Sequence, residues 1–106
     1  DEVAFYKKNS SGTIRPITNK KPNELGIYDM TGNVNEWCYD WHNHEYYSSN
    51  NNKNPKGPES GFSRVLRGGD YLDLTINCRL TKRDHGYADC VWSSNGFRVV
   101  RTAKYD

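Results

Sequence analysis

The chain contains three histidines, and these side chains most directly suggest metal binding or general base catalysis. His42 and His44 lie two positions apart, next to Glu45, in a stretch without regular periodicity, and His85 is far away in the sequence. The residues around His42 supply no third ligand, so we expect exposed loop histidines. Sequence motifs of serine hydrolases, phosphate-binding loops and zinc proteases are absent.

Cysteines are the second reactive group, at Cys38, Cys78 and Cys90. Three cysteines cannot all pair within one chain. One disulfide with a free thiol fits a mildly oxidising compartment, and three reduced thiols fit the cytosol. Because no two cysteines have C-x-x-C spacing, we do not expect zinc binding through cysteine pairs.

Short strands must position these side chains. Residues 36–41 alternate between polar side chains and large rings, which predicts a strand with Trp37, Tyr39 and Trp41 on one face. Residues 42–62 are rich in Asn, Gly and Pro and predict a loop, whereas residues 70–95 follow no clear helix or strand period. Three further short strands are expected at residues 3–6, 63–67 and 96–101, the last of them buried. Gly68 and Gly69 predict a bulge or a close backbone approach.

Composition limits the chain to one small domain. It has 106 residues, 34% of them hydrophobic and 13% aromatic, and the mean hydropathy is −1.02. A domain this small and polar is marginally stable alone, so we expect part of a larger domain. The net charge is +2 with dispersed basic residues, which argues against nucleic-acid binding. No membrane span or signal peptide is predicted, and any signal or lipid anchor of an exported parent would lie upstream.

Four ordered motifs carry a family resemblance. Residues 23–38 spell Asn-Glu-Leu-Gly-Ile-Tyr-Asp-Met-Thr-Gly-Asn-Val-Asn-Glu-Trp-Cys, and three more motifs follow at 64–69, at Cys78-Arg79 with Arg83, and at 95–98. This pattern resembles the formylglycine-generating enzyme (sulfatase-modifying factor) family.

The resemblance implies a C-type-lectin-like fold: a loop-rich α+β domain with a small antiparallel sheet and little helix. It identifies residues 1–106 as a single partial domain, the C-terminal half, which would pack against an upstream half. It also implies an extracytoplasmic or cell-surface location. Structural roles are expected for Trp37, Trp41, Cys38, Cys78, Arg67, Phe97 and Arg98.

Enzymes of this family oxidise a substrate cysteine with two cysteines that bind copper. The resemblance aligns those two positions with Thr75 and Leu80, neither of which supplies the soft ligand that copper(I) needs. We therefore favour a protein that is not an enzyme. The alternative is a copper oxidase that uses Cys78 and Cys90 instead.

Another branch of the fold family consists of the variable proteins of diversity-generating retroelements, which are not enzymes. In them, the segment between the Gly-Gly and Gly-Phe-Arg motifs is diversified to bind ligands. The resemblance places residues 70–95 on that exposed face, so we expect a protein or surface ligand to bind there. Rings and adaptable polar groups typical of binding surfaces make up the expected site: Tyr71, Asp73, Lys82, Asp84, His85, Tyr87 and Trp92. A third alternative is a structural domain of a larger surface lipoprotein without a ligand.

Glu36 allows two interpretations. Together with Asn33 and nearby carbonyls it supplies the hard oxygen atoms that calcium prefers, and the resemblance permits a calcium site. Alternatively, a buried Glu36 requires a cationic partner such as Arg67 or Arg98. Calcium is the metal we expect here, and copper is expected only for the oxidase alternative.

Overall fold

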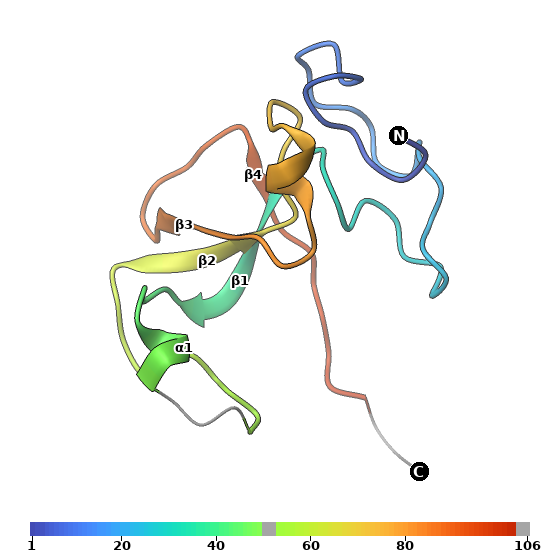
Figure 1. The fold of residues 1–106 in the computed structure, drawn as a ribbon. Helices are drawn as coiled ribbons and strands as arrows, with labels where there is room; N and C mark the ends of the chain where they lie inside the picture. The colour runs from blue at the N-terminus through green and yellow to red at the C-terminus, as the bar shows by residue number, and fades with distance from the viewer. Residues whose placement is uncertain (50–52, 104–106) are drawn as a thin grey trace.

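The computed structural model describes residues 1–49 and 53–103. Its strands form a four-stranded sheet in the order β3-β2-β1-β4, with little helix and long irregular connections (Figure 1). The strands are β1 (Asn35–Trp41), β2 (Ser63–Arg67), β3 (Arg83–Tyr87) and β4 (Asn95–Gly96). The predicted loop-rich lectin-like fold with a small sheet is confirmed.

β1 and β2 pair antiparallel, and both lie where the residue pattern predicted strands. Trp37 pairs with Leu66 and Trp41 with Arg64, so residues 38–40 of β1 face a single residue of β2. This irregularity breaks the period-two alternation, and the Tyr39 side chain is 88% exposed. The predicted aromatic face therefore retains Trp37 and Trp41, which are half-buried, but not Tyr39.

The outer strands differ from expectation. β3 pairs antiparallel with β2, in a segment for which no strand was predicted. β4 pairs parallel with β1, so the sheet is mixed. The prediction of a buried strand at 96–101 was wrong, because β4 ends at Gly96. Phe97, Val99 and Val100 are 79%, 88% and 90% exposed, since no element of the described chain packs on them.

The N-terminal residues form an irregular region beside the sheet (Figure 1). The strand expected at residues 3–6 is reduced to one bridge between Phe5 and Gly32. Gly32 has a φ of +77°, and a Cβ there would lie 2.2 Å from the Phe5 carbonyl oxygen. Only glycine allows the two segments to approach this closely.

The core of the described chain is small. Its buried apolar residues are Ala4, Tyr6, Val65, Leu66 and Cys78. Two short helices lie outside the sheet: α1 (Tyr46–Ser49), in the predicted loop, and the 3-10 helix η1 (Thr75–Cys78). Among the described residues, no helix is long and apolar enough to cross a membrane.

Candidate functional site

Both ends of the 70–95 segment are attached to the same short stretch of the scaffold. At the start, the Tyr71 N–H donates to the Asn33 carbonyl at 2.8 Å, and the Asn35 side-chain amide donates to Asp70 Oδ2 at 3.2 Å. At the end, the Asn35 N–H donates to the Ser94 carbonyl at 2.7 Å. Asn33 and Asn35 therefore close the segment at its base.

Asp70 organises the first turn of the segment. Its Oδ1 accepts the Leu72 N–H at 2.8 Å, while its own N–H donates to Asp73 Oδ2 at 2.9 Å. Burial raises the pKa of Asp70, and the negative charge of Asp73 adds to the rise. Hydrogen bonds from Leu72, from Asp73 and from the Ser94 side chain oppose it.

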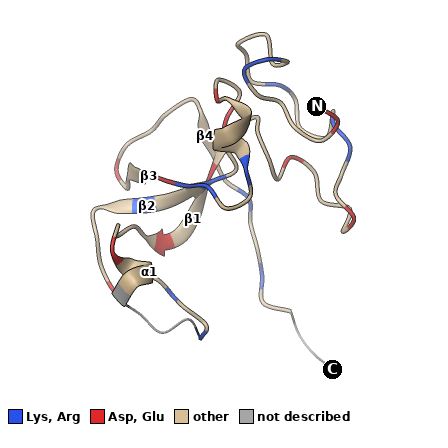
Figure 2. Ribbon diagram, in the orientation of Figure 1, with Lys and Arg blue, Asp and Glu red and all other residues tan. Residues whose placement is uncertain are grey.

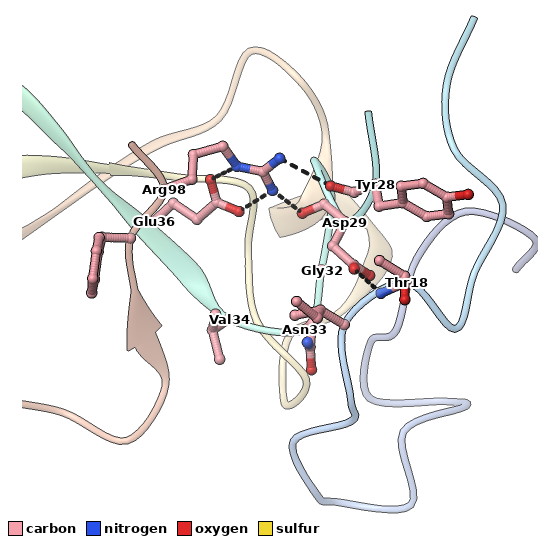
Figure 3. A pocket seen from close by; sticks show the side chains of 10 residues that line it. Thr18, Tyr28, Asp29, Gly32, Asn33, Val34, Glu36 and Arg98 are labelled. Atoms are coloured by element: carbon pink, nitrogen blue, oxygen red, sulfur yellow. Dashed lines mark hydrogen bonds and ion pairs between the residues drawn. The ribbon is translucent and has the colours of Figure 1, made fainter. Parts of the chain in front are cut away.

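An ion pair joins Glu36 on β1 to Arg98, two residues after β4 (Figure 3). The Arg98 Nε and Nη2 atoms donate to Glu36 Oε2 and Oε1 at 2.6 and 2.5 Å. The guanidinium also donates to the carbonyls of Tyr28 and Asp29, both at 3.0 Å. The hydrogen bond to Glu36 is the main cause that raises the pKa of Arg98. The structure therefore agrees with the second interpretation of Glu36, in which an arginine is the partner of its carboxylate.

A cavity of about 280 Å³ adjoins this ion pair. Figure 3 shows Asp29 between the ion pair and Thr18, whose N–H donates to Asp29 Oδ2 at 2.8 Å. Within the described chain, the buried Asp29 Oδ1 has no hydrogen-bond partner. Such an atom is a favourable contact for water or a cation.

The calcium prediction can be compared with this geometry. Asn33 Oδ1 accepts the Arg15 N–H at 2.9 Å, and both carboxylate oxygens of Glu36 are bound by Arg98. Calcium needs six to eight oxygen ligands, so an ion at Asn33 and Glu36 would have to displace these donors. In this arrangement the two residues do not fit the ion, and calcium binding there stays a prediction.

The seven predicted ligand-binding residues are divided between several places. Asp73, Lys82 and Asp84 line one cavity of about 80 Å³, beside the backbone of Gly68 and Gly69. Neighbouring residues of a strand point to opposite faces, which separates Asp84 from His85. Tyr87 and Trp92 are 64% and 61% exposed. Tyr71 is half-buried at the base.

The structure brings the three histidines together. His85 on β3 stacks on His42, with ring centroids 4.1 Å apart, and His44 lies beside both rings. The residues around His42 do not reveal this contact, because it depends on the pairing of β3 with β2. The fold thus brings a third imidazole to His42 and His44.

Cys38, Cys78 and Cys90 are free cysteines, with no disulfide between them. Cys78 is buried, and burial raises its pKa, with Asp73 and Asp70 adding to the effect. Burial also raises the pKa of the half-buried Cys38, and the positive charge of Arg67 opposes the rise. Thiolate chemistry requires the opposite shift. Thr75 and Leu80, at the positions aligned with the enzyme cysteines, are exposed.

Asn35, Asp70 and Ser94 hold the base, although no motif in the sequence indicated a role for them. Their signal was weak: polar residues with hydrogen-bonding side chains stand at both ends of a segment without periodicity. Arg67, one predicted structural residue, donates from Nη1 to the Leu80 carbonyl at 3.1 Å. It thereby ties β2 to the chain after η1.

Comparisons with known proteins agree with the geometry. The family model "Sulfatase-modifying factor enzyme 1-like domain" matches residues 2–103. The chain is 38% identical over 96 residues to "Serine/threonine-protein kinase pkn1" of Chlamydia caviae, covering 89% of the chain and 16% of that protein. It is 37% identical over 91 residues to the formylglycine-generating enzyme of Streptomyces coelicolor, covering 83% of the chain and 29% of the enzyme.

Among solved structures, "Treponema denticola variable protein 1" is similar with a TM-score of 0.77 and 33% identity. That likeness covers 91% of the chain and 34% of the variable protein. The chain thus spans about a third or less of the length of each of these relatives.

Proposed function

The chain belongs to the sulfatase-modifying factor enzyme 1-like family, and from this premise we propose that it is a non-catalytic ligand-binding domain. In this proposal, the lectin-type scaffold displays residues 70–95 to a macromolecular ligand. The likeness to the Treponema denticola variable protein, which covers 91% of the chain, supports the proposal.

The observation that carries the proposal is the closed base of the segment. Asn35 is hydrogen-bonded to Asp70 at one end and to Ser94 at the other. Exposed side chains between these points can therefore change without altering the attachment of the segment at its base, while β3 keeps its middle paired with β2. A fixed base under a variable surface is what a display scaffold requires.

The exposed residues of the segment have the chemistry of a binding surface. Tyr87 and Trp92 present large rings, which bury much area at a low cost in conformational entropy. Asp73, Lys82 and Asp84 surround a small polar cavity that suits one charged or hydrogen-bonding group of a ligand. Charges of both signs are spread over the rest of the ribbon (Figure 2). We therefore propose recognition by rings and a few polar contacts rather than by net charge.

The ligand we propose is a protein or another macromolecule at a cell or phage surface. Such a ligand requires an extracytoplasmic location, and we propose that location for the domain. The upstream half of the domain, predicted from the resemblance, would be the second partner of this chain.

A copper oxidase is the second candidate, because the chain is 37% identical to a formylglycine-generating enzyme. It would depend on Cys78 and Cys90. The burial that raises the pKa of Cys78 disfavours the thiolate that copper(I) needs. Stoichiometric copper(I) binding that is lost in both Cys78→Ser and Cys90→Ser, together with oxidation of a cysteine-containing peptide, would establish the oxidase instead.

The retroelement interpretation is tested at the gene. We expect a reverse transcriptase gene nearby, with a near-copy of the sequence that encodes residues 70–95 and differs from it mainly at adenines. A locus without these elements would exclude diversification by a retroelement, but not ligand binding.

Ligand binding is tested with a displayed library. We expect that a library diversified at Asp84, His85, Tyr87 and Trp92 yields folded clones that bind a chosen target protein. The matched control diversifies Val3, Ile14, Leu25 and Tyr39, which are also exposed but lie outside the segment. If the first library is mostly unfolded, or if both libraries yield binders equally often, the proposed role of the segment is wrong.

A further inference from the structure

The histidine cluster is a second group of side chains with a defined chemistry, and it shares only His85 with the surface proposed for ligand display. His42, His44 and His85 are all the histidines of the chain. One ring nitrogen of each lies within 4.8 Å of those of the other two. The ring centroids are 4.1 Å apart for His42 and His85, 4.7 Å for His42 and His44, and 5.7 Å for His44 and His85.

The fold brings these rings together from three elements. The His42 N–H donates to the Ser63 carbonyl at 2.8 Å, which continues the β1–β2 pairing past the end of β1. His85 lies on β3 and pairs with Val65, on the far side of β2. His42 and His85 therefore flank β2 from opposite sides, and the pairing of β2 with its two neighbours sets their separation.

His44 is positioned by a turn. Asn43 Oδ1 accepts the Glu45 N–H at 2.8 Å, and the Asn43 carbonyl accepts the Tyr46 N–H at the start of α1. An Asn side chain that binds the backbone two residues ahead fixes a tight turn locally. The turn directs the His44 ring edge-on to His42, with an interplanar angle of 87°.

We propose that His42, His44 and His85 form a binding site for a divalent transition metal ion of the zinc class. Three imidazoles are nitrogen ligands that suit zinc, and they leave a fourth tetrahedral position for water or an incoming ligand atom. Zinc–nitrogen bonds of about 2.0–2.1 Å place the nitrogens about 3.3 Å apart. The rings therefore have to close slightly, and His44 and His85 are exposed and free to turn.

The ion would link the edge strand β3 to the turn after β1. The site is independent of the Asp73–Lys82–Asp84 cavity, because Asp84 and His85 point to opposite faces of β3. His85 belongs to both proposals, but zinc binding is measured without any macromolecular ligand, so the failure of one proposal is distinguishable from the failure of the other.

The test is titration of the purified, untagged protein with Zn²⁺ against a chromophoric chelator. We expect one zinc ion to bind per chain. The zinc affinity should fall at least about 10-fold in each of the variants His42→Gln, His44→Gln and His85→Gln. Loss of even an outer-shell partner weakens metal binding about 10–100-fold. The control is Cys90→Ser, which removes a thiol from the same strand-and-turn region and should leave zinc affinity unchanged.

Two further measurements separate this site from alternatives. Co²⁺ in place of Zn²⁺ should give the visible absorption of a four-coordinate site without a thiolate charge-transfer band. Zn²⁺ should raise the melting temperature of the wild type but not of His85→Gln, because only native-state binding stabilises. Zinc affinity that is equal in the wild type and the three histidine variants, or lost in Cys90→Ser, would overturn the proposal.

Discussion

Residues 26–41 and residues 70–95 are both short of regular structure, but they are held in different ways. The first stretch contains β1, and its side chains and carbonyls are tied inward by Arg98, Arg15 and Thr18. The second is tied at its two ends by Asn35 and Asn33 and in its middle by the pairing of β3 with β2, and many of its side chains are exposed. One region supplies the scaffold and the other its surface.

This difference shows how a polar chain keeps a defined fold. Five buried apolar residues form the described core, and so few side chains contribute little apolar burial. Directed polar contacts therefore carry an unusual share of the stability, and they concentrate in residues 26–41. We expect substitutions there to be costly and substitutions on the exposed part of 70–95 to be tolerated.

The largest expected effect is that of Gly32→Ala. The new Cβ would lie 2.2 Å from the Phe5 carbonyl oxygen, at a residue with a φ of +77°. We therefore expect the free energy of unfolding to fall by at least about 3 kcal/mol. Gly26→Ala is the matched control, with a φ of +76° and open space around it. Only the conformational cost of about 1–2 kcal/mol should remain there. Urea denaturation measures both, and equal losses would contradict the close approach.

Arg98→Ala should be the next most damaging. It leaves the half-buried Glu36 without its partner and frees two carbonyls, so we expect a loss of about 2–3 kcal/mol in unfolding free energy. Arg98→Lys keeps the charge but not the fork of donors and should recover only part of it. Full recovery by lysine would mean that charge alone matters.

Asn35→Ala tests the base of the segment directly. It removes the side-chain donor to Asp70, so we expect the free energy of unfolding to fall by about 1–2 kcal/mol. Amide hydrogen exchange should become faster across residues 70–95, more than in β2. Asn19→Ala, at an exposed position outside both regions, is the control. Faster exchange confined to β1 would show that Asn35 does not hold the segment.

Cys78 gives the smallest expected effect, and it depends on pH. The folded state raises the pKa of this thiol from the ordinary value of 9.0, so the folded chain retains the proton where the unfolded chain has lost it. The contribution of the thiol to stability is therefore constant below pH 9.0 and falls as the pH rises through the raised value.

The stability advantage of the wild type over Cys78→Ala should accordingly shrink as urea unfolding is repeated at increasing pH above 9.0. Cys90→Ala is the control, because Cys90 lies outside the core. An advantage that grows with pH would mean that Cys78 is stabilised as a thiolate, which would favour the copper oxidase.

Local pattern predicted part of this architecture. β2 coincides with its predicted residues and β1 begins one residue earlier than predicted, because both alternate clearly between polar and apolar side chains. β3 was missed since Arg83-Asp84-His85-Gly86-Tyr87 has no apolar alternation. It forms because β2 offers it a partner, with Gly86 lying against the Trp37 ring.

The candidate sites depended on contacts that no local pattern records. The Glu36–Arg98 pair joins residues far apart in sequence, and it was one of two arginine partners considered. The histidine cluster and the double attachment of Asn35 both follow from strand pairing, which brings β3 and β4 alongside β2 and β1. The prediction of a buried strand at 96–101 failed because an apolar run is buried only where another element packs on it.

The central claim is that a fixed base carries a tolerant surface. Its most direct test compares the unfolding free energy of Asn35→Ala with that of the combined variant His85→Ala, Tyr87→Ala, Trp92→Ala, in metal-free buffer. Exposed substitutions typically change stability by about 0.5 kcal/mol or less each. We therefore predict that three replacements on the surface cost less than the single replacement at the base. A combined variant that is less stable than Asn35→Ala would contradict the account.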